Sequence, residues 1–241
     1  MIPKILHFCW FGGNKKSALI EKCIKSWKKY CPDYEIVEWN EDNFDVHCCK
    51  YVEEAYEMKK WAFVSDYCRF YALEKMGGIY LDTDVELLKP LNPYLNTPII
   101  AFENEKKLAP GLVFGAEKGD KICKELLAEY GNDYFKKEDG AFNPRTVCDR
   151  ATDLFLKYGL VDDNTLQEVA GYTVYPTKYF NPYDMDSGKI TIGEETVSIH
   201  HYAGSWVDKK SKFRGKVYNF LVRIFGKKFA EKIRKILGRK S

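Results

Sequence analysis

The order strand, helix, strand at the start of the chain restricts the fold more than any other feature. Residues 2–11 are mostly apolar and end at Gly12-Gly13, which is typical of a buried strand. Residues 17–30 place apolar side chains at helical spacing, and residues 34–39 alternate as a strand does. Two strands joined by a helix run parallel in one sheet. The opening therefore predicts an α/β protein.

The rest of the chain continues this pattern. We expect a helix-rich stretch over residues 50–76, ended by Gly77-Gly78, and helices over 120–130 and 145–158. Short strands are expected over 79–81, 85–88, 98–102, 112–116, 173–175 and 196–200. The predicted fold is a Rossmann-like, mixed but mostly parallel sheet flanked by helices. With 241 residues, of which 45% are hydrophobic, the chain suits one catalytic domain with a short appendage.

The cysteines and the N-terminus indicate a cytoplasmic protein. None of the eight cysteines forms a CxxC pair or has zinc-ligand spacing with a histidine. The first residues lack the features of a signal peptide, and no apolar run is long enough to span a membrane. We therefore expect free thiols in a reducing compartment.

Charge is divided unevenly along the chain. Residues 207–241 hold 13 basic and 2 acidic residues, a net charge of +11, whereas the other 206 residues hold 25 basic and 33 acidic ones, a net charge of −8. Residues 217–237 have a basic amphipathic helical pattern that Gly226 could break. This pattern predicts that 208–241 bind an anionic membrane surface; the alternative is a helix packed on the acidic body. Because the rest of the chain is acidic, nucleic acid is not an expected partner.

Asp82-Thr83-Asp84 follows a short apolar strand and is the first candidate for chemistry. Two carboxylates at this spacing can help a divalent cation to hold a diphosphate. Taken alone, the triplet is more typical of a solvated turn.

The preceding helix strengthens the case. Ala62, Ser65, Asp66 and Arg69 fall on one helical face, which is partly polar within an otherwise aromatic segment. One interpretation is a structural Asp66–Arg69 ion pair. The other is a platform that binds sugar hydroxyls.

The segment from residue 62 to residue 84 reads A-x-x-S-D-x-x-R-x-x-x-L-x-x-x-G-G-I-Y-L-D-x-D. It resembles the sugar-binding region of family 32 glycosyltransferases, which include Och1-like mannosyltransferases and bacterial capsular polysaccharide enzymes. It is more distantly similar to the glucosyltransferase domain of clostridial toxins. The opening residues 2–13 and the segment His200-His201-Tyr202-Ala203-Gly204-Ser205-Trp206 are also similar to the bacterial members, so the resemblance covers 1–206.

The resemblance implies a GT-A fold over residues 1–206, with the basic tail 207–241 outside it. It also implies roles for individual residues. Trp10 would stack on the base, and Ser65, Asp66 and Arg69 would bind the donor. Asp82 would contact the ribose or a metal-bound water. Ser205 and Trp206 would close over the diphosphate. Asp84 and His201 would ligate Mn²⁺, or Mg²⁺, although the adjacent His200 leaves open which imidazole faces the metal. The expected catalytic set is Asp66, Arg69, Asp82 and Asp84.

The resemblance further implies a retaining, metal-assisted hexosyltransferase. The donor would be a nucleotide sugar, with UDP favoured over GDP, and the acceptor a glycan or lipid-linked glycan in surface polysaccharide synthesis. The enzyme would be peripheral on the cytoplasmic face of the membrane. Two alternatives stay open: another metal-dependent nucleotide enzyme such as a nucleotidyltransferase, or an inactive membrane-associated scaffold.

Overall fold

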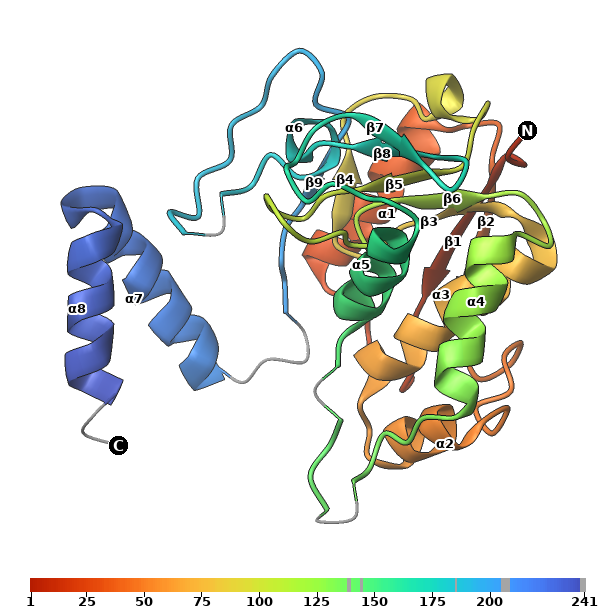
Figure 1. Ribbon diagram of the computed structural model, residues 1–241, viewed down its shortest axis with the longest axis horizontal. Coiled ribbons are helices and arrows are strands. Elements are labelled where there is room, and N and C mark those ends of the chain that lie inside the picture. Colours follow the sequence, from red (N-terminus) through yellow and green to blue (C-terminus); the bar gives the residue numbers. More distant parts are fainter. Residues whose placement is uncertain (138–139, 144, 185, 205–208, 239–241) are drawn as a thin grey trace.

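A computed structural model describes residues 1–137, 140–143, 145–184, 186–204 and 209–238. Its centre is a seven-stranded mixed sheet in the order β2-β1-β3-β6-β5-β8-β7 (Figure 1). The strands of this sheet are β1 (Ile5–Cys9), β2 (Glu35–Trp39), β3 (Gly78–Tyr80), β5 (Ile99–Ala101), β6 (Phe114–Ala116), β7 (Gln167–Val169) and β8 (Tyr172–Tyr175). A second sheet pairs β4 (Val85–Leu87) with β9 (Ser198–His200) in antiparallel fashion.

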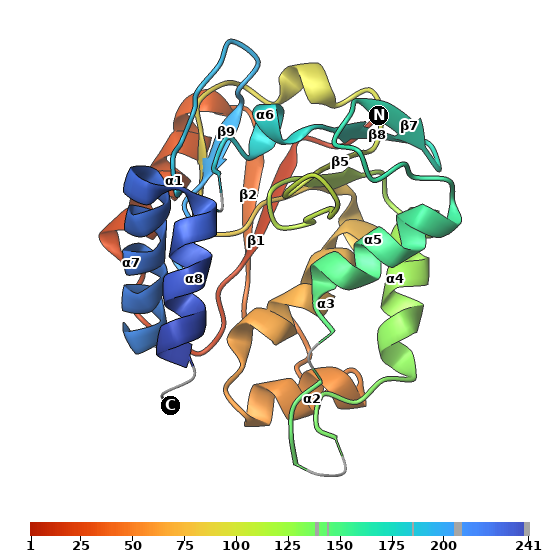
Figure 2. The same cartoon turned by 60° about the vertical axis from the view of Figure 1, so that its left-hand side comes forward.

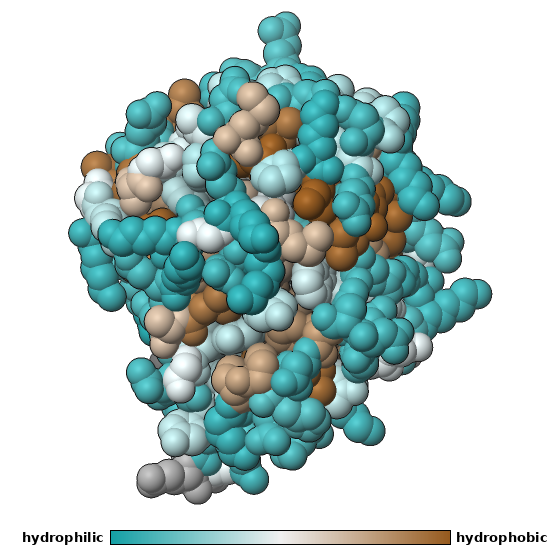
Figure 3. Space-filling view, turned by 90° about the vertical axis from the view of Figure 1, so that its right-hand side faces the viewer, coloured by the Kyte–Doolittle hydropathy of each residue, from teal (hydrophilic) through white to brown (hydrophobic). Residues whose placement is uncertain are grey.

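Helices flank the large sheet, as predicted. They are α1 (Ala18–Tyr30), α2 (Lys50–Glu57), α3 (Trp61–Met76), α4 (Lys121–Gly131), α5 (Val147–Lys157) and the short α6 (Thr177–Phe180), with a 3₁₀ turn at Asn92–Tyr94. Figure 2 shows α3, α4 and α5 together on one side of the sheet, with α1 on the other. On the side of α4, the surface is mainly hydrophilic with small hydrophobic patches (Figure 3).

The first strands confirm the expected parallel arrangement. β1 pairs in parallel with both β2 and β3. Alternate side chains of β1 enter the two cores: Leu6 and Phe8 pack in the core that includes Trp27 of α1, and Cys9 packs in the core that includes Phe70 of α3. All eight cysteines are free thiols, as expected.

The Gly77-Gly78 pair makes the tight connection between α3 and β3. Gly77 ends the helix at φ 69°, and Gly78 begins the strand at φ 114°. A Cβ on Gly78 would lie 2.7 Å from the Ile5 carbonyl oxygen, so a larger residue would push β3 away from β1. The pair therefore brings the carboxyl end of β3, and Asp82 after it, beside the carboxyl end of β1.

The C-terminal tail differs in detail from the predicted helix. It forms two helices, α7 (Lys209–Phe225) and α8 (Lys227–Gly238), which pack against each other as a hairpin. The break is at Gly226, as the sequence suggested, with φ 80°. The first helix begins eight residues earlier than the apolar pattern indicated. Among the described residues, none of the helices is both long and apolar enough to cross a membrane.

Candidate active site

A buried ion-pair cluster lies where β3 ends. Arg69 of α3 donates a hydrogen bond from Nη2 to Asp66 Oδ1 at 2.7 Å, and the same nitrogen lies 3.4 Å from Asp82 Oδ1. The Arg69 side chain is 4% exposed, and its Nη1 has no hydrogen-bond partner among the described residues. A buried guanidinium nitrogen without an acceptor is costly, and it suits a phosphate or sugar oxygen supplied by a ligand.

Tyr80 and Gly111 fix the position of Asp82. The Tyr80 hydroxyl donates to Asp82 Oδ1 at 3.1 Å, and the Arg69 guanidinium stacks 4.7 Å from the Tyr80 ring centre. The backbone N–H of Asp82 donates to the Gly111 carbonyl oxygen at 2.8 Å. A Cβ on Gly111 would lie 2.0 Å from Asp82 Oδ2, so only glycine leaves room for the carboxylate in this position.

Asp66 has an unusual environment for a carboxylate. Burial raises its pKa to about 6, an effect that Arg69 opposes and the nearby Asp82 strengthens. The Asp66–Arg69 pair expected as the structural alternative is therefore present. It is buried next to Asp82, not solvated on the helix surface, so the structural and the ligand-binding interpretations are compatible.

Asp84 meets the second sheet. Its Oδ1 lies 2.9 Å from His200 Nε2, and its Oδ2 accepts a hydrogen bond from the Ala203 backbone N–H at 2.7 Å. Burial alone would raise the pKa of Asp84, but the bonds from His200 and Ala203 outweigh it and hold the pKa below its usual value. Burial alone would lower the pKa of His200, but the hydrogen bond and negative charge of Asp84 outweigh burial and raise that pKa above its usual value. The Nδ1 atom of His200 is buried without a partner among the described residues.

The structure places His200, and not the predicted His201, beside the Asp84 carboxylate. Successive side chains at the end of β9 point to opposite sides. His201 Nε2 therefore lies 2.8 Å from Glu86 Oε2, and Glu86 also accepts from Lys22. Only the backbone N–H of His201 reaches the Asp84 residue, at its carbonyl oxygen.

The residues around Asp84 fit a divalent cation as a partial site. No group of three or more His, Cys, Asp or Glu side chains in the described part of the chain is arranged to hold a metal by itself. Mg²⁺ and its relatives are often bound by one or two carboxylates together with substrate phosphates. Asp84 and Asp82 offer hard oxygen ligands, and His200, with its orphaned Nδ1, offers an imidazole that suits Mn²⁺ better than Mg²⁺.

Of the other residues predicted to bind the donor, the structure describes Trp10 and Ser65 but not Ser205 and Trp206. Trp10 follows β1 and is half-buried; its indole N–H donates to the Asn14 carbonyl oxygen at 2.6 Å, and the Lys16 ammonium lies 5.4 Å from its ring centre. The Ser65 hydroxyl donates to the Trp61 carbonyl oxygen within α3. Ser205 and Trp206 lie outside the described residues.

Some residues near the site carried no clear sequence signal. Glu103 follows β5, and burial raises the pKa of its carboxyl, with His200 and Asp82 among the charges that act on it. Asn181 donates from Nδ2 to both the Glu103 carbonyl oxygen and the Tyr202 hydroxyl, and the Tyr202 ring lies 4.1 Å from that of His200. Glu103, Asn181 and Tyr202 are far apart in sequence, so the fold brings these three together, whereas Tyr202 is only two positions from His200.

Arg150 of α5 was also not foreseen. Its side chain is fully buried and forms an ion pair with Asp133. The guanidinium stacks 4.1 Å from the ring centre of Tyr130, and its charge helps to lower the pKa of Asp66 against the effect of burial.

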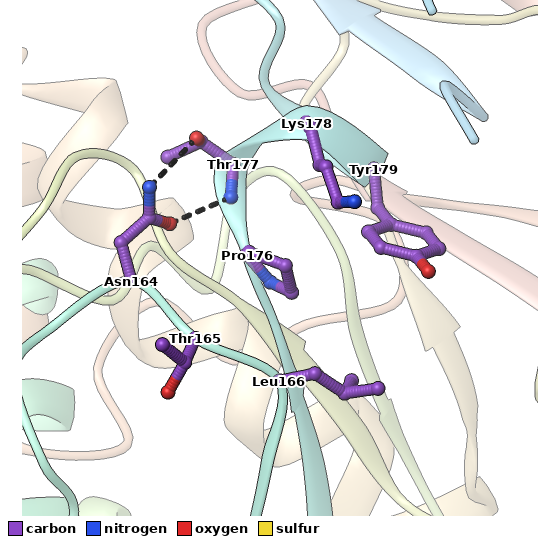
Figure 4. Close-up of a pocket in the computed structure, with 7 residues that line it drawn as sticks. All are labelled: Asn164, Thr165, Leu166, Pro176, Thr177, Lys178 and Tyr179. Carbon is purple, nitrogen blue, oxygen red and sulfur yellow. Dashed lines mark hydrogen bonds between the residues drawn. The ribbon is translucent and has the colours of Figure 1, made fainter. Parts of the chain in front are cut away.

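A surface cavity of about 400 Å³ is separate from this site. Figure 4 shows its lining, in which Asn164 forms two hydrogen bonds with Thr177 beside Lys178 and Tyr179. None of the cluster residues around Asp66, Asp82 or Asp84 lines it.

Comparison with known proteins finds sequence similarity over part of the chain. Residues 17–103 match the family described as glycosyltransferase sugar-binding region containing DXD motif. The chain is 30% identical over 138 residues to inositol phosphoceramide mannosyltransferase 3 of Schizosaccharomyces pombe (strain 972 / ATCC 24843). That match covers 52% of this chain and only 36% of the relative.

Two solved structures share the fold. The PaToxG glycosyltransferase superposes with a TM-score of 0.52 at 19% identity, over 65% of this chain and 69% of that one. A glycosyltransferase involved in the glycosylation of the major capsid of PBCV-1 superposes with a TM-score of 0.50 at 13% identity, over 83% of this chain and 95% of that one. The chain therefore has a GT-A-type fold, and its residues 17–103 match the DXD-containing sugar-binding region of a glycosyltransferase family.

Proposed function

We propose that the protein is a metal-assisted, retaining hexosyltransferase that uses a nucleotide diphosphate sugar, with UDP favoured over GDP. The observation that carries the proposal is the buried cluster of Asp66, Arg69 and Asp82 next to the Asp84–His200 pair. One arginine nitrogen in this cluster lacks an acceptor, which matches a ligand rich in oxygen atoms. The matched region, 17–103, contains Asp66, Arg69, Asp82 and Asp84.

Each side chain has a proposed task. Arg69 donates from Nη1 to an oxygen of the donor, and Asp66 accepts from a sugar hydroxyl while Arg69 keeps it ionised. Asp84, with Asp82 and His200, would hold Mn²⁺ or Mg²⁺, which supplies charge neutralisation for the departing diphosphate. Trp10 stays the proposed contact for the base.

Retention fits a front-face reaction. We assign Asp66 and Asp84 to ligand binding and not to nucleophilic attack, because Arg69 holds Asp66 Oδ1, and His200 and the Ala203 backbone N–H hold the two oxygens of Asp84. A departing phosphate oxygen would then help to take the proton of the acceptor hydroxyl, and the protein would contribute positioning and electrostatic stabilisation. Glu103 is our candidate for a hydrogen bond to the acceptor hydroxyl, because it combines burial with proximity to Asp82 and His200.

We further propose a glycan or lipid-linked acceptor in surface polysaccharide synthesis, at the cytoplasmic face of a membrane. The partition of charge into a body of −8 and a tail of +11 supports this location.

Turnover of candidate donors tests the function. Full-length protein should release UDP or GDP from one member of a nucleotide-sugar panel when Mn²⁺ is present, and should transfer the sugar when a suitable glycan is added. Formation of a nucleotide sugar from a nucleoside triphosphate and a sugar phosphate would instead support a nucleotidyltransferase. No turnover of any donor would support the scaffold alternative.

A further inference from the structure

Polar contacts tie the α7–α8 hairpin to the body. Arg223 donates from Nε to the Ser187 carbonyl oxygen at 2.6 Å and from Nη2 to the Gly188 carbonyl oxygen at 2.5 Å. Lys227 Nζ lies 2.8 Å from Asp186 Oδ2. We call these contacts the polar clasp. Figure 1 shows the hairpin beside the α/β body, and not within its layers.

The hairpin also exposes large apolar side chains. Val217, Phe220 and Ile224 lie at i, i+3 and i+7 on α7, where their exposed fractions are 41%, 58% and 56%. At the bend, the rings of Phe225 and Phe229 lie 4.9 Å apart, and both are exposed. We call these five residues the apolar ridge. A contiguous exposed apolar strip of this kind indicates a surface that binds a partner.

Basic residues border the ridge. Arg214, Arg223, Lys227, Lys228 and Lys232 are all exposed on the two helices. Of these, Arg223 and Lys227 belong to the polar clasp, while Lys228 and Lys232 form no ion pair with another described residue. The ridge therefore combines an apolar strip with a cationic border, which is the pattern of a helix that lies in a membrane interface.

We propose that the apolar ridge inserts into the surface of an anionic bilayer, with Arg214, Lys228 and Lys232 against the lipid phosphates. A second copy of the chain that packs ridge against ridge is a poorer occupant, because it would bring two tails of +11 together. Packing on the acidic body is also a poorer explanation, because the clasp already joins the hairpin to the body and leaves the ridge exposed. The inference deepens the proposed function, since a lipid-linked acceptor lies at such a surface, but lipid binding needs no transferase chemistry.

Vesicle flotation of the full-length protein tests this surface. The probes are vesicles of phosphatidylcholine alone and of phosphatidylcholine mixed with anionic phosphatidylglycerol. The wild type should float with the anionic vesicles, less so at high salt, and remain in solution with the neutral ones. The double variant Phe220→Ser with Ile224→Ser should lose about tenfold in vesicle affinity, because apolar insertion is lost.

A matched control comes from the body. Val161 and Leu166 are as exposed as the ridge residues, at 56% and 57%, but lie before β7 and away from the tail. The double variant Val161→Ser with Leu166→Ser should float like the wild type, whereas Lys228→Gln with Lys232→Gln should bind anionic vesicles more weakly.

Equal flotation of the ridge variant and the wild type would overturn the proposal. So would a wild type that stays off anionic vesicles but forms a dimer that the ridge variant abolishes. Donor hydrolysis, measured without vesicles in the same variants, should be unchanged. Absence of hydrolysis together with normal flotation would count against the proposed function and leave the lipid surface standing.

Discussion

Gly111→Ala is the sharpest probe of the Asp82 position. The added Cβ would lie 2.0 Å from Asp82 Oδ2, whereas ordinary van der Waals contact begins near 3.4 Å. The carboxylate must therefore move by about 1.4 Å, which would disturb its contacts with Arg69 and Tyr80. A misplacement of about 1 Å in a catalytic site can cost about 100-fold in rate. We expect kcat/KM for the donor to fall by about that factor, which is about 2.7 kcal/mol of transition-state stabilisation.

The same substitution should change stability little. The Asp82 side chain is 30% exposed and can turn toward solvent, and Gly111 does not have a positive φ that would strain alanine. Gly131→Ala, at the end of α4, is the matched control, because apart from its chain neighbours and its own helix backbone no atom lies within 4 Å of the added Cβ. The control should keep full activity and unfold at the same or a slightly higher denaturant concentration.

A double-mutant cycle completes the test. If Gly111→Ala acts through Asp82, it should add almost nothing in an Asp82→Ala background. Steady-state donor hydrolysis measures all four proteins. A Gly111→Ala variant within threefold of wild-type kcat/KM would refute the reasoning, and so would a full additional loss in the Asp82→Ala background.

Three further results are expected. Asp84→Asn should lose Mn²⁺ binding in calorimetry and nearly all transfer, whereas Asp153→Asn, on the surface of α5, should keep both. His200→Gln should weaken Mn²⁺-dependent activity more than His201→Gln, because only His200 contacts the Asp84 carboxylate, and the reverse order would contradict the site. The pKa of Asp66 is about 6 in the folded state, above the unfolded value of 3.8, so between these pH values the folded state holds a proton that the unfolded state releases. The free energy of unfolding should therefore fall as pH rises from about 4 to 6, by up to about 3 kcal/mol in total. Urea titrations should show this decrease in the wild type but not in Asp66→Asn.

Much of the fold could be predicted because its signals are local. The apolar run before Gly12-Gly13, the spacing of Ile20, Cys23 and Trp27, and the Gly77-Gly78 stop each act within a few residues, and the structure confirms the elements they predict. Short elements were missed. Strand β7 has three residues and helix α6 has four, which is too few to show an apolar periodicity in the sequence. Contacts with the neighbouring elements decide their conformation.

The site was predictable only where its residues lie close in sequence. Asp66, Arg69 and Asp82 share one helix-turn-strand segment, so their meeting follows from local geometry. Which histidine meets Asp84 depends instead on the register of β9 against β4, and a shift of one residue exchanges the two faces. Gly111 carried no signal, because its effect depends on how closely it approaches a carboxylate 29 positions earlier in the chain.

We propose that this site binds a nucleotide sugar with the help of a divalent cation. Calorimetric titration of the full-length protein with UDP- and GDP-sugars, each with and without Mn²⁺, measures it most directly. We predict that one nucleotide class binds, that binding weakens strongly when EDTA removes the metal, and that Asp84→Asn abolishes the Mn²⁺ effect. Binding that is the same with and without metal, or no binding of any nucleotide sugar, would contradict the account.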